Sequence, residues 1–413
     1  MWTFTRRALV GSAAATALAL TAMVSGNEAQ AQKKYDEGAT DTKIKIGHTN
    51  PYSGNLSSYG QIGKTIEAAF KKVNDEGGIN GRKLSLVTYD DGFTPPRTLE
   101  MTRKLIEEDK VLFLFNTLGT APNSAIHKYV NAKKIPHLFV SSGASKWGNP
   151  KDFPWTMGWQ PDYITECAIY AKHMLANMKD PKVGVIMQND DAGKDFLNGF
   201  KQGLGNENEK LIVAIATHEA TDPTVDSQII QLANSGANVL FIATGPKHSA
   251  QSIKKAGELN WKRDTTYLVN VSISIGSVLK PAGLDHSQGL ITAQFLKEVT
   301  DPQWEKSPDV IAFKAFMAKY MPNADVKDWN HTYGYSVTTS LVHVLKAAGD
   351  NLTRENLIKQ AASLKGVDVP LALDGIKLNT SPTDFYPLQS LQLSQFKGEK
   401  WELFGKILSA ESQ

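Results

Sequence analysis

The sequence predicts an α/β protein of two βα domains with parallel sheets. Strand-like apolar runs alternate along the chain with amphipathic helical stretches. The predicted strands are continuous apolar runs, which is typical of parallel strands that helices cover on both faces. About 380 residues follow a predicted leader segment, and this length favours two domains.

The predicted strands fall into two blocks, in which helical patterns follow the strands. The first block has strands at 43–51, 83–91, 111–119 and 137–143. The second block begins with the helical pattern TECAIYAKHMLANM and has strands at 182–191, 211–220, 238–245, 267–272 and 289–295. Repeated βα units imply right-handed crossovers, so their loops gather at the carboxyl ends of the strands.

The first 31 residues have the pattern of a secretory signal peptide. Arg6-Arg7 supply the charged region, an alanine-rich apolar segment spans 8–24, and Ala29-Gln30-Ala31 forms a small-x-small cleavage site. We therefore expect export to the periplasm with cleavage after Ala31. Residues 5–9 loosely match a twin-arginine signal, so the twin-arginine and the general secretory route both stay open.

Composition argues against several classes of protein. The formal net charge is +3 over 413 residues, which does not favour nucleic-acid binding or a strongly basic membrane-binding surface. Cys167 is the only cysteine of the sequence, so an internal disulfide cannot form. The nine histidines are scattered without an HExxH spacing. We expect neither a metal nor a cofactor.

Enzyme motifs are incomplete. Residues 58–65 nearly match a phosphate-binding loop, but Ser58 stands where the motif requires glycine. No GxSxG elbow occurs. Asp190 and Asp191 could act as catalytic carboxylates, but we interpret Asp191 as the cap of a helix that begins near Ala192, and Asp190 as a brace for a loop or a ligand hydroxyl. We expect that the protein is not an enzyme.

One corner of the chain, FLFNTLGTAPNSA at 113–125, offers a possible anion site. An apolar strand ends at Asn116, small residues follow, and a helical pattern begins behind Pro122. The chain thus exposes backbone N–H groups beside a hydroxyl at the N-terminus of a helix. This arrangement can hold an anion or simply turn the chain.

Three segments carry a family resemblance: IKIGHTNPYSGNLSSYGQIG, VNDEGGINGRKLSLVTYDD and KVGVIMQNDDAGKDF. They resemble the branched-chain amino acid type of periplasmic substrate-binding protein, the type I solute receptors of ABC importers. The similarity covers nearly all of the chain after the leader. Within this family, residues 153–161, 301–306 and 379–387 look most like the subgroup that takes up aromatic acids.

The resemblance implies two Rossmann-like lobes joined by three crossing strands, with the ligand in a cleft that closes by a hinge. The crossings would fall near Gln160, Gln294 and Leu388. A protein of this family would work as a monomer and deliver its ligand to an inner-membrane ABC permease. The implied amino-terminal lobe comprises 35–161 and 294–387, and the carboxyl-terminal lobe comprises 162–293 and 388–413.

The resemblance also places the ligand carboxylate between two loops, which here read Leu118-Gly119-Thr120-Ala121 and Ser141-Ser142-Gly143. The hydroxyl groups of Thr120, Ser141 or Ser142, with nearby N–H groups, can bind a carboxylate without a full counter-charge. In the alternative interpretation, Thr120 only caps its helix.

The amino acid binders of the family need an acidic residue for the ligand ammonium. By position this acid would fall at Val271, and the neighbouring Asn270 is neutral too. An ammonium closed into a dry cleft without a carboxylate is costly. The difference favours a carboxylic acid with an apolar, aromatic body, of benzoate or cinnamate type, over an α-amino acid.

Aromatic side chains could surround such a body. Tyr59 matches a family position beside the ligand, Trp159 lies at a predicted hinge strand, and Tyr333 lies on the helix that enters the cleft. Each of them could equally pack in the core. Many relatives carry a tyrosine at the position of Ala192, so alanine leaves room there for a larger ring, a substituent or a water molecule.

The sequence leaves three other functions open. The first is a receptor for a branched-chain amino acid or amide, with the ammonium held by Asp190 or by carbonyl groups. The second is a sensor subunit that signals to a membrane kinase. The third is an exported enzyme.

Overall fold

The computed structural model describes residues 1–2 and 33–409. The predicted signal peptide and its cleavage site after Ala31 therefore lie almost wholly outside the described residues. Two large sheets organise residues 33–409, one with five strands and one with seven. Two small sheets pair β1 (Lys34–Tyr35) with β12 (Asn351–Leu352) and β13 (Val367–Asp368) with β14 (Lys377–Leu378).

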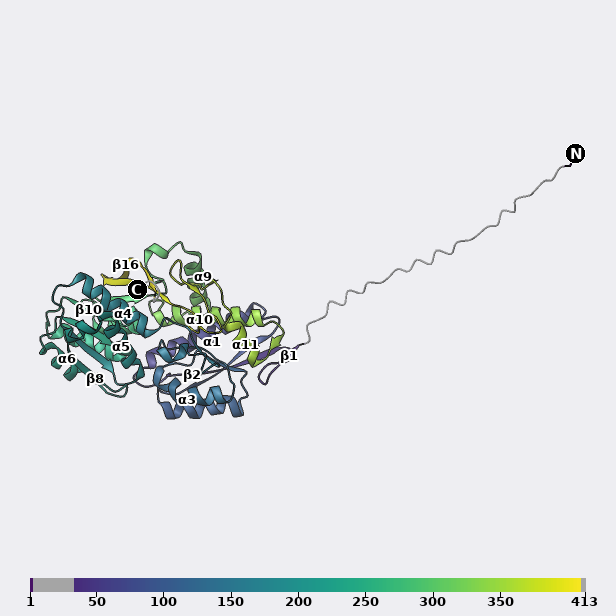
Figure 1. Ribbon diagram of the computed structural model, residues 1–413, viewed down its shortest axis with the longest axis horizontal. Coiled ribbons are helices and arrows are strands. Elements are labelled where there is room, and N and C mark those ends of the chain that lie inside the picture. Colours follow the sequence, from purple (N-terminus) through teal and green to yellow (C-terminus); the bar gives the residue numbers. More distant parts are fainter. Residues whose placement is uncertain (3–32, 410–413) are drawn as a thin grey trace. The chain divides into compact units, whose positions relative to one another are not determined.

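The five-stranded sheet is parallel throughout, in the order β3-β2-β4-β5-β6. Helices α1 and α10 lie on one side of β2 and α3 lies on the other (Figure 1). Both faces are thus covered, as the continuous apolar strands predicted. The strands are β2 (Lys43–Asn50), β3 (Lys83–Asp90), β4 (Phe113–Phe115), β5 (His137–Val140) and β6 (Thr156–Gly158). The helices are α1 (Gly60–Asp75), α2 (Pro95–Arg103), α3 (Thr120–Ala132), α9 (Pro308–Tyr320), α10 (Trp329–Ala348) and α11 (Arg354–Ala361).

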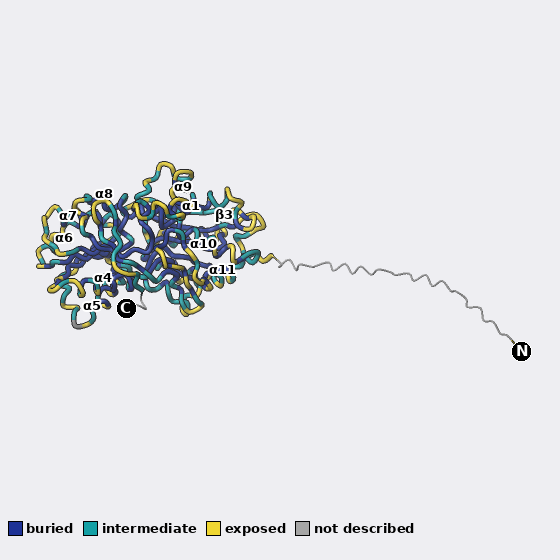
Figure 2. Tube along the Cα trace, turned by 90° about the horizontal axis from the view of Figure 1, so that it is seen from above, coloured by how far each residue is buried: buried dark blue, intermediate teal, exposed yellow. Residues whose placement is uncertain are grey.

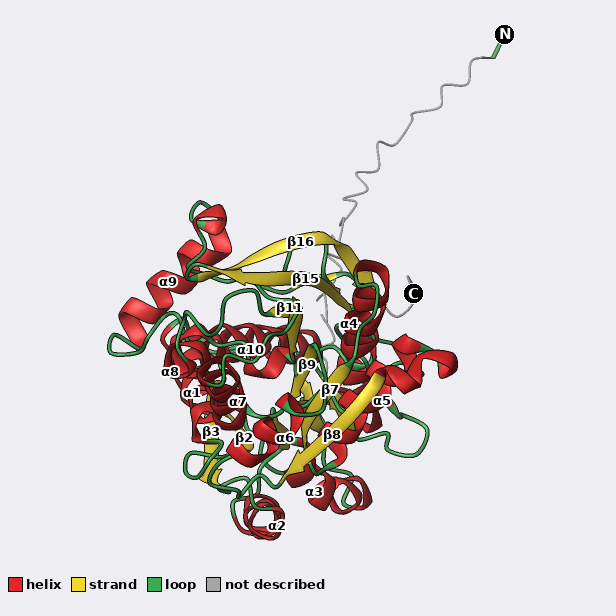
Figure 3. Cartoon of the chain, turned by 90° about the vertical axis from the view of Figure 1, so that its left-hand side faces the viewer, coloured by secondary structure: helices red, strands yellow, loops and turns green. Residues whose placement is uncertain are grey.

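The seven-stranded sheet has the order β16-β15-β11-β10-β9-β7-β8. Helices α4 and α5 pack against each other on one side of β7 and β9, and α6 and α7 lie on the other side (Figure 3). The strands are β7 (Val183–Gln188), β8 (Ile212–His218), β9 (Val239–Ala243), β10 (Thr265–Leu268), β11 (Ile291–Gln294), β15 (Ser390–Lys397) and β16 (Lys400–Ser409). The helices are α4 (Tyr163–Asn177), α5 (Asp191–Leu204), α6 (Asp226–Ala233), α7 (Pro246–Glu258) and the short α8 (Lys280–Ala282).

This second sheet is parallel from β8 to β11, as predicted, and two antiparallel strands extend it at one edge. Strand β15 runs antiparallel to β11, and β16 runs antiparallel to β15 (Figure 3). The physical reason is the connection, because the two residues Gly398 and Glu399 between β15 and β16 can join only antiparallel neighbours. Gly398 has a φ of 61°, which suits a tight hairpin turn.

The chain passes between the two sheets three times. It leaves the five-stranded sheet after β6 and enters α4, it returns after β11 toward α9, and it crosses again before β15. These passages make each half of the fold discontinuous in sequence. The lobe boundaries at 161, 293 and 387 stay predictions.

Burial follows the position of each strand in its sheet. Every residue of β5, β7 and β9 is buried, and the buried segments run through the interior of the molecule (Figure 2). Strand β8 lies at the edge, and its residues alternate between less and more exposed ones; Val213 and Ile215 are each 41% exposed. Cys167 of α4 is buried.

Most of the predicted strands are shorter than the runs that predicted them, and two of them show why. Strand β4 stops at Phe115 because Asn116 takes a positive φ of 51°, which extended backbone does not adopt. Strand β10 stops at Leu268, and Asn270–Ser272 form a 3-10 turn instead. The released residues form loops at the carboxyl ends of the strands.

Candidate functional site

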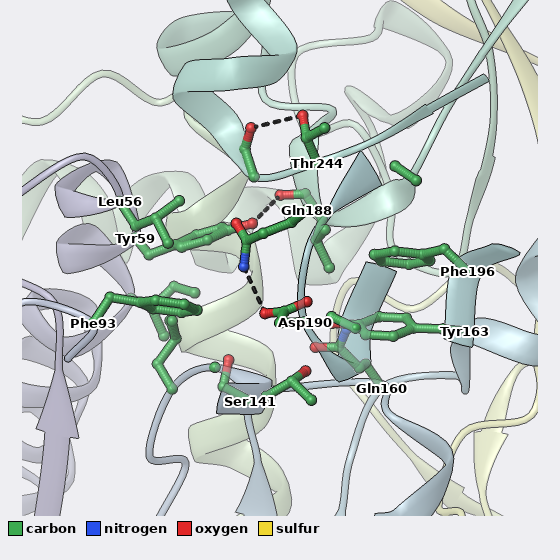
Figure 4. Close-up of a pocket in the computed structure, with 18 of the residues that line it drawn as sticks. Leu56, Tyr59, Phe93, Ser141, Gln160, Tyr163, Gln188, Asp190, Phe196 and Thr244 are labelled. Atoms are coloured by element: carbon green, nitrogen blue, oxygen red, sulfur yellow. Dashed lines mark hydrogen bonds between the residues drawn. The ribbon is translucent and has the colours of Figure 1, made fainter. Parts of the chain in front are cut away.

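A pocket lies where the loops after the strands of the two sheets meet (Figure 4). Its space free of atoms is about 600 Å³, counted together with the part that is open to solvent. Apolar and aromatic side chains make up most of its wall. The elements around the five-stranded sheet contribute Leu56, Tyr59, Ile62, Phe93, Leu118, Gly119, Thr120, Ser141, Trp329 and Tyr333. Gln160 and Tyr163 lie at the first passage between the sheets, and the other side contributes Gln188, Asp190, Ala192, Phe196, Ala243, Thr244, Gly245 and Val271.

The structure brings together some of the predicted site residues and leaves others outside. The predicted residues that line the pocket are Tyr59, Leu118, Thr120, Ser141, Asp190, Ala192 and Val271. The predicted residues that lie outside the lining are Ser142, Gly143, Trp159 and Asn270. Tyr333, which the sequence placed on a helix entering the cleft, also lines the pocket.

The corner between β4 and α3 is built on Gly119. This residue is the N-cap of α3 with a φ of 98°, and a Cβ on it would lie 2.3 Å from the ring of Phe93. Only glycine combines this conformation with this close contact. The N–H groups of Thr120 and Ala121 start the helix and have no acceptor one turn earlier within it. The corner therefore presents helix N–H groups next to the pocket.

Thr120 does not cap its helix, so that alternative interpretation is wrong. No side chain caps α3, and Thr120 is its first helical residue. The Oγ1 atom of Thr120 lies 2.7 Å from Oγ of Ser142. The Ser142 hydroxyl also accepts hydrogen bonds from Trp147 Nε1 at 2.9 Å and from the Ala144 N–H at 3.2 Å. Ser142 thus stands behind Thr120 and orients its hydroxyl.

The other two residues of the Ser141-Ser142-Gly143 loop have separate roles. Ser141 lines the pocket, and its N–H and carbonyl group bond the backbone of Thr117 and Gly119. Gly143 packs against Tyr163, since a Cβ on Gly143 would lie 2.6 Å from the tyrosine ring. Of this loop, only the side chain of Ser141 therefore lines the pocket. Gly143 leaves room for the ring of Tyr163, which forms part of the pocket wall.

On the opposite side, Asp190 begins α5. Its Oδ1 accepts a hydrogen bond from the Gly193 N–H at 3.0 Å, and its Oδ2 accepts one from Gln188 Nε2 at 2.6 Å. Asp190, not Asp191, is therefore the N-cap, so the predicted cap was wrong by one residue. Burial raises the pKa of the Asp190 carboxyl, while these two hydrogen bonds oppose the shift.

The loop after β10 is held by a buried acid. The Asn270 N–H donates to Glu166 Oε1 at 2.6 Å, and Asn270 Nδ2 donates to the Ala293 carbonyl at 2.6 Å, so the Asn270 side chain is directed away from the pocket lining. Burial raises the pKa of Glu166 to about 7. Val271 reaches the pocket, and its carbonyl accepts a hydrogen bond from the Tyr59 hydroxyl at 3.1 Å.

Trp159 supports the pocket from behind. It is fully buried, and its Nε1 donates to Ser340 Oγ at 3.0 Å. Its ring meets the Tyr333 ring edge-on, with 4.9 Å between the centroids. On the other side the rings of Tyr163 and Phe196 are in contact at a tilt of 35°, with 4.0 Å between their centroids, and Ala192 lines the same pocket. The aromatic wall is therefore partly the one predicted and partly built from rings that were not predicted.

Several lining residues were missed by sequence reasoning, among them Phe93, Gln160, Gln188, Phe196 and Thr244. A usable signal did exist for some of them. Gln188 is the last residue of β7, Thr244 directly follows β9, and Phe93 follows β3. Polar or aromatic residues at the carboxyl ends of parallel strands mark the usual ligand edge of such sheets.

Side chains also join the two sides directly. Asn55 Nδ2 donates to the carbonyl groups of Ala220 and Asp222, each at 3.0 Å, and Lys247 Nζ donates to Asn55 Oδ1 at 2.8 Å. Together with the contact between Tyr59 and Val271, these bonds hold the loops of the two sheets together around the pocket.

Residues 1–2 and 33–409 contain neither a membrane-spanning helix nor a cluster of metal-binding side chains. No helix there is both long and apolar enough to span a membrane. Within the same residues, no cluster of three or more His, Cys, Asp or Glu side chains could hold a metal ion.

Similarity to known sequences covers most of the chain. A model of the periplasmic binding protein family matches residues 43–399. The Leu/Ile/Val-binding protein homolog 1 of Brucella abortus (strain 2308) is 26% identical over 345 residues, which is 80% of this chain and 84% of that protein.

Solved structures share the fold. A branched chain amino acid ABC transporter protein from Thermus thermophilus with bound valine superposes with a TM-score of 0.80 at 14% identity, over 90% of this chain and 98% of that one. A fatty acid ABC transporter substrate-binding protein from Thermomonospora curvata gives a TM-score of 0.77 at 20% identity, over 92% of this chain and 96% of that one. The chain thus belongs to the periplasmic binding protein family and has the type I fold of its branched-chain amino acid transporter class.

Proposed function

We propose that this periplasmic binding protein captures a small carboxylate with an apolar, aromatic body and delivers it to an inner-membrane ABC permease. The mature protein begins after Ala31, works as a monomer in the periplasm and is not an enzyme. Its lobes, 35–161 with 294–387 and 162–293 with 388–413, close on the ligand by a hinge.

The observation that carries the proposal is the position of Val271. In the amino acid binders of the family an acid at this position meets the ligand ammonium, but here an apolar side chain lines the pocket. The Val271 carbonyl could have accepted a hydrogen bond from an ammonium in place of the acid, but it already accepts one from the Tyr59 hydroxyl. An ammonium at this point would lose its hydration without a charged partner.

The anion grip is the corner at the start of α3. Thr120 and Ser141 line the pocket with hydroxyl groups, and the first turn of α3 adds N–H groups and the positive end of the helix dipole. Among the described residues that line the pocket there is no lysine or arginine. A grip made of neutral donors binds a carboxylate and still permits release at the permease.

The body of the ligand lies among rings. Tyr59 and Phe93 approach from one side and Tyr163 and Phe196 from the other (Figure 4). Aromatic side chains favour flat apolar groups through offset and edge-on contacts. Ala192 leaves the space in which a ring can lie.

A second candidate is a branched-chain amino acid whose ammonium meets Asp190. The carboxylate of Asp190 in the pocket favours it, as do the names of the relatives, which mention leucine, isoleucine and valine. The name of the structure from Thermomonospora curvata mentions a fatty acid instead, which agrees with a carboxylate on an apolar body. None of the relatives named above is described as an aromatic acid binder.

Thermal unfolding with added ligands separates the candidates. Benzoate and cinnamate should raise the melting temperature of the purified protein, and leucine and valine should not. A ligand at a hundred times its dissociation constant adds about 2.7 kcal/mol to the free energy of unfolding. Hexanoate tests whether the ring itself is needed. A shift with leucine and none with the aromatic acids would overturn the proposal.

A further inference from the structure

Asp190 brings a carboxylate into a pocket with mostly apolar walls, and within residues 33–409 this carboxylate has no ion-pair partner. In Figure 4 it lies between Gln188 and the labelled residues Gln160 and Tyr163. The lysines that approach this end of α5, Lys146 and Lys194, pair with the neighbouring Asp191. The Asp190 carboxylate accepts hydrogen bonds from the Gly193 N–H and from the side-chain amide of Gln188. Since a carboxylate accepts about four hydrogen bonds, acceptor positions remain.

We infer that Asp190 selects ligands that carry a hydroxyl group in addition to their carboxylate. This inference rests on the proposed function, in which Thr120 and Ser141 hold the carboxylate. A bound ligand excludes water from Asp190, so a ligand without a donor leaves a charged acceptor unsatisfied. Sites built to bond a ligand hydroxyl discriminate strongly against the analogue that lacks it.

A hydroxyl fits this position better than an ammonium. An ammonium brings three donors and needs three acceptors. Besides Asp190, the polar residues that the close-up shows beside it are Gln160, Gln188 and Tyr163, which offer only neutral acceptors, and the carbonyl of Val271 elsewhere in the lining already has a donor (Figure 4). A hydroxyl needs only one acceptor, which Asp190 supplies. Because a hydroxyl is neutral, such a ligand brings only one charge into the pocket, that of its carboxylate.

The role of Asp190 as a helix cap can be separated from this role. Asparagine caps helices as well as aspartate does, so Asp190→Asn keeps the bond to the Gly193 N–H. It replaces one carboxylate oxygen by an NH₂ group, which cannot accept from a ligand hydroxyl. Asp162 is the matched control, because it caps α4 through the Thr165 N–H at 2.9 Å and lies outside the pocket lining.

The experiment uses calorimetry with matched pairs of acids on the full mature protein. The pairs are benzoate and 4-hydroxybenzoate, cinnamate and 4-hydroxycinnamate, and phenylacetate and mandelate. In the parent protein, the hydroxylated acid of at least one pair should bind about tenfold tighter or more, as expected for a hydrogen bond to a charged acceptor. In Asp190→Asn this ratio should fall toward one, and in Asp162→Asn it should stay as in the parent.

The other outcomes identify which idea fails. If the acids bind but hydroxylation changes nothing in the parent, or if its effect survives in Asp190→Asn, the role of Asp190 is overturned and carboxylate capture stands. If no aromatic acid binds, both ideas fail. Binding of leucine that is lost in Asp190→Asn would assign Asp190 to an ammonium and overturn the hydroxyl.

Discussion

Lys146 Nζ lies 2.6 Å from Asp191 Oδ2 and 3.0 Å from Ser124 Oγ. One ammonium therefore joins the turn Ser145–Gly148 and helix α3 to the first residue of α5, next to pocket residues Asp190 and Ala192. The Ser145 N–H adds a bond to Asp195 Oδ2 at 2.7 Å. The hydrogen bond from Lys146 is the main reason why the pKa of Asp191 is lowered. These bonds hold together elements of the two sheets.

Lys146→Met should weaken ligand binding. The pair is partly exposed, and such pairs contribute about 0.2–1 kcal/mol. Affinity should therefore fall by at most about fivefold, and by less at high salt. Calorimetry measures the affinity, and small-angle scattering should show a larger radius of gyration for the ligand-free variant if the bond favours closure.

Lys194→Met is the control for this pair. Lys194 Nζ lies 3.6 Å from Asp191 Oδ1, but both residues belong to α5. This ion pair therefore does not connect elements on the two sides of the pocket. Equal losses of affinity in the two variants would mean that the charge near Asp191 matters and the bridge does not.

Thr120→Val should lower ligand affinity about ten- to a hundredfold, because a hydrogen bond to a charged group is worth roughly 1.5–3 kcal/mol. Valine keeps the shape of threonine and removes its hydroxyl. Thr102→Val is the control, since the Thr102 hydroxyl is buried in α2 and has no hydrogen-bond partner among the described residues. If calorimetry shows that Thr120→Val binds the ligand as tightly as the parent, the Thr120 hydroxyl does not bind the carboxylate and the turn between β4 and α3 is only structural.

Ala192→Tyr should change which ligands bind. The new ring enters the pocket on the side of Phe196, which lies four residues further along α5, so the longer cinnamate should lose more affinity than benzoate. Ligand-induced compaction in small-angle scattering should persist, because the contacts of Lys146 and Asn55 are untouched. If Ala192→Tyr and the parent bind the acids in the same order of affinity, Ala192 does not contact the ligand.

Glu166→Gln should stabilise the protein at high pH. Burial raises the pKa of Glu166 from 4.5 to about 7. The folded protein thus retains a proton that the unfolded chain has lost, and the free energy of unfolding falls as pH rises through this range. Glutamine removes this dependence and keeps an oxygen for the Asn270 N–H. The melting temperature of the variant relative to the parent should therefore rise between about pH 4.5 and about pH 7; a constant difference would contradict the assignment.

The fold could be predicted well where burial controls the sequence. Strands β7 and β9 are buried throughout, so their residues are almost all apolar and the runs were recognised. The hairpin of β15 and β16 was missed as strands because it lies at a sheet edge, where SLQLSQFK mixes polar with apolar residues. Its pairing with β11 is a long-range contact that no local pattern encodes.

The site could be predicted in part, for a similar reason. Thr120 and Ser141 were found because their loops follow strands in a family pattern. Ser142 and Asn270 bond elsewhere, because the direction of their side chains is set by partners such as Trp147 and the Ala293 carbonyl. The exchange of roles between Asp190 and Asp191 has the same origin. Either residue can cap a helix, and in the structure Asp190 caps α5 while Asp191 pairs with Lys146 from a distant part of the sequence.

The burial of Cys167 makes the wild-type chain suitable for site-specific labelling. This residue is the only cysteine of the sequence, and burial raises the pKa of its thiol, which keeps the reactive thiolate rare. A cysteine introduced at an exposed position such as Lys194 would therefore react with a fluorophore while Cys167 stays unmodified. A dye at that position, beside Asp191, would report ligand capture optically, so the protein can become a sensor for its own ligand without prior removal of a native thiol.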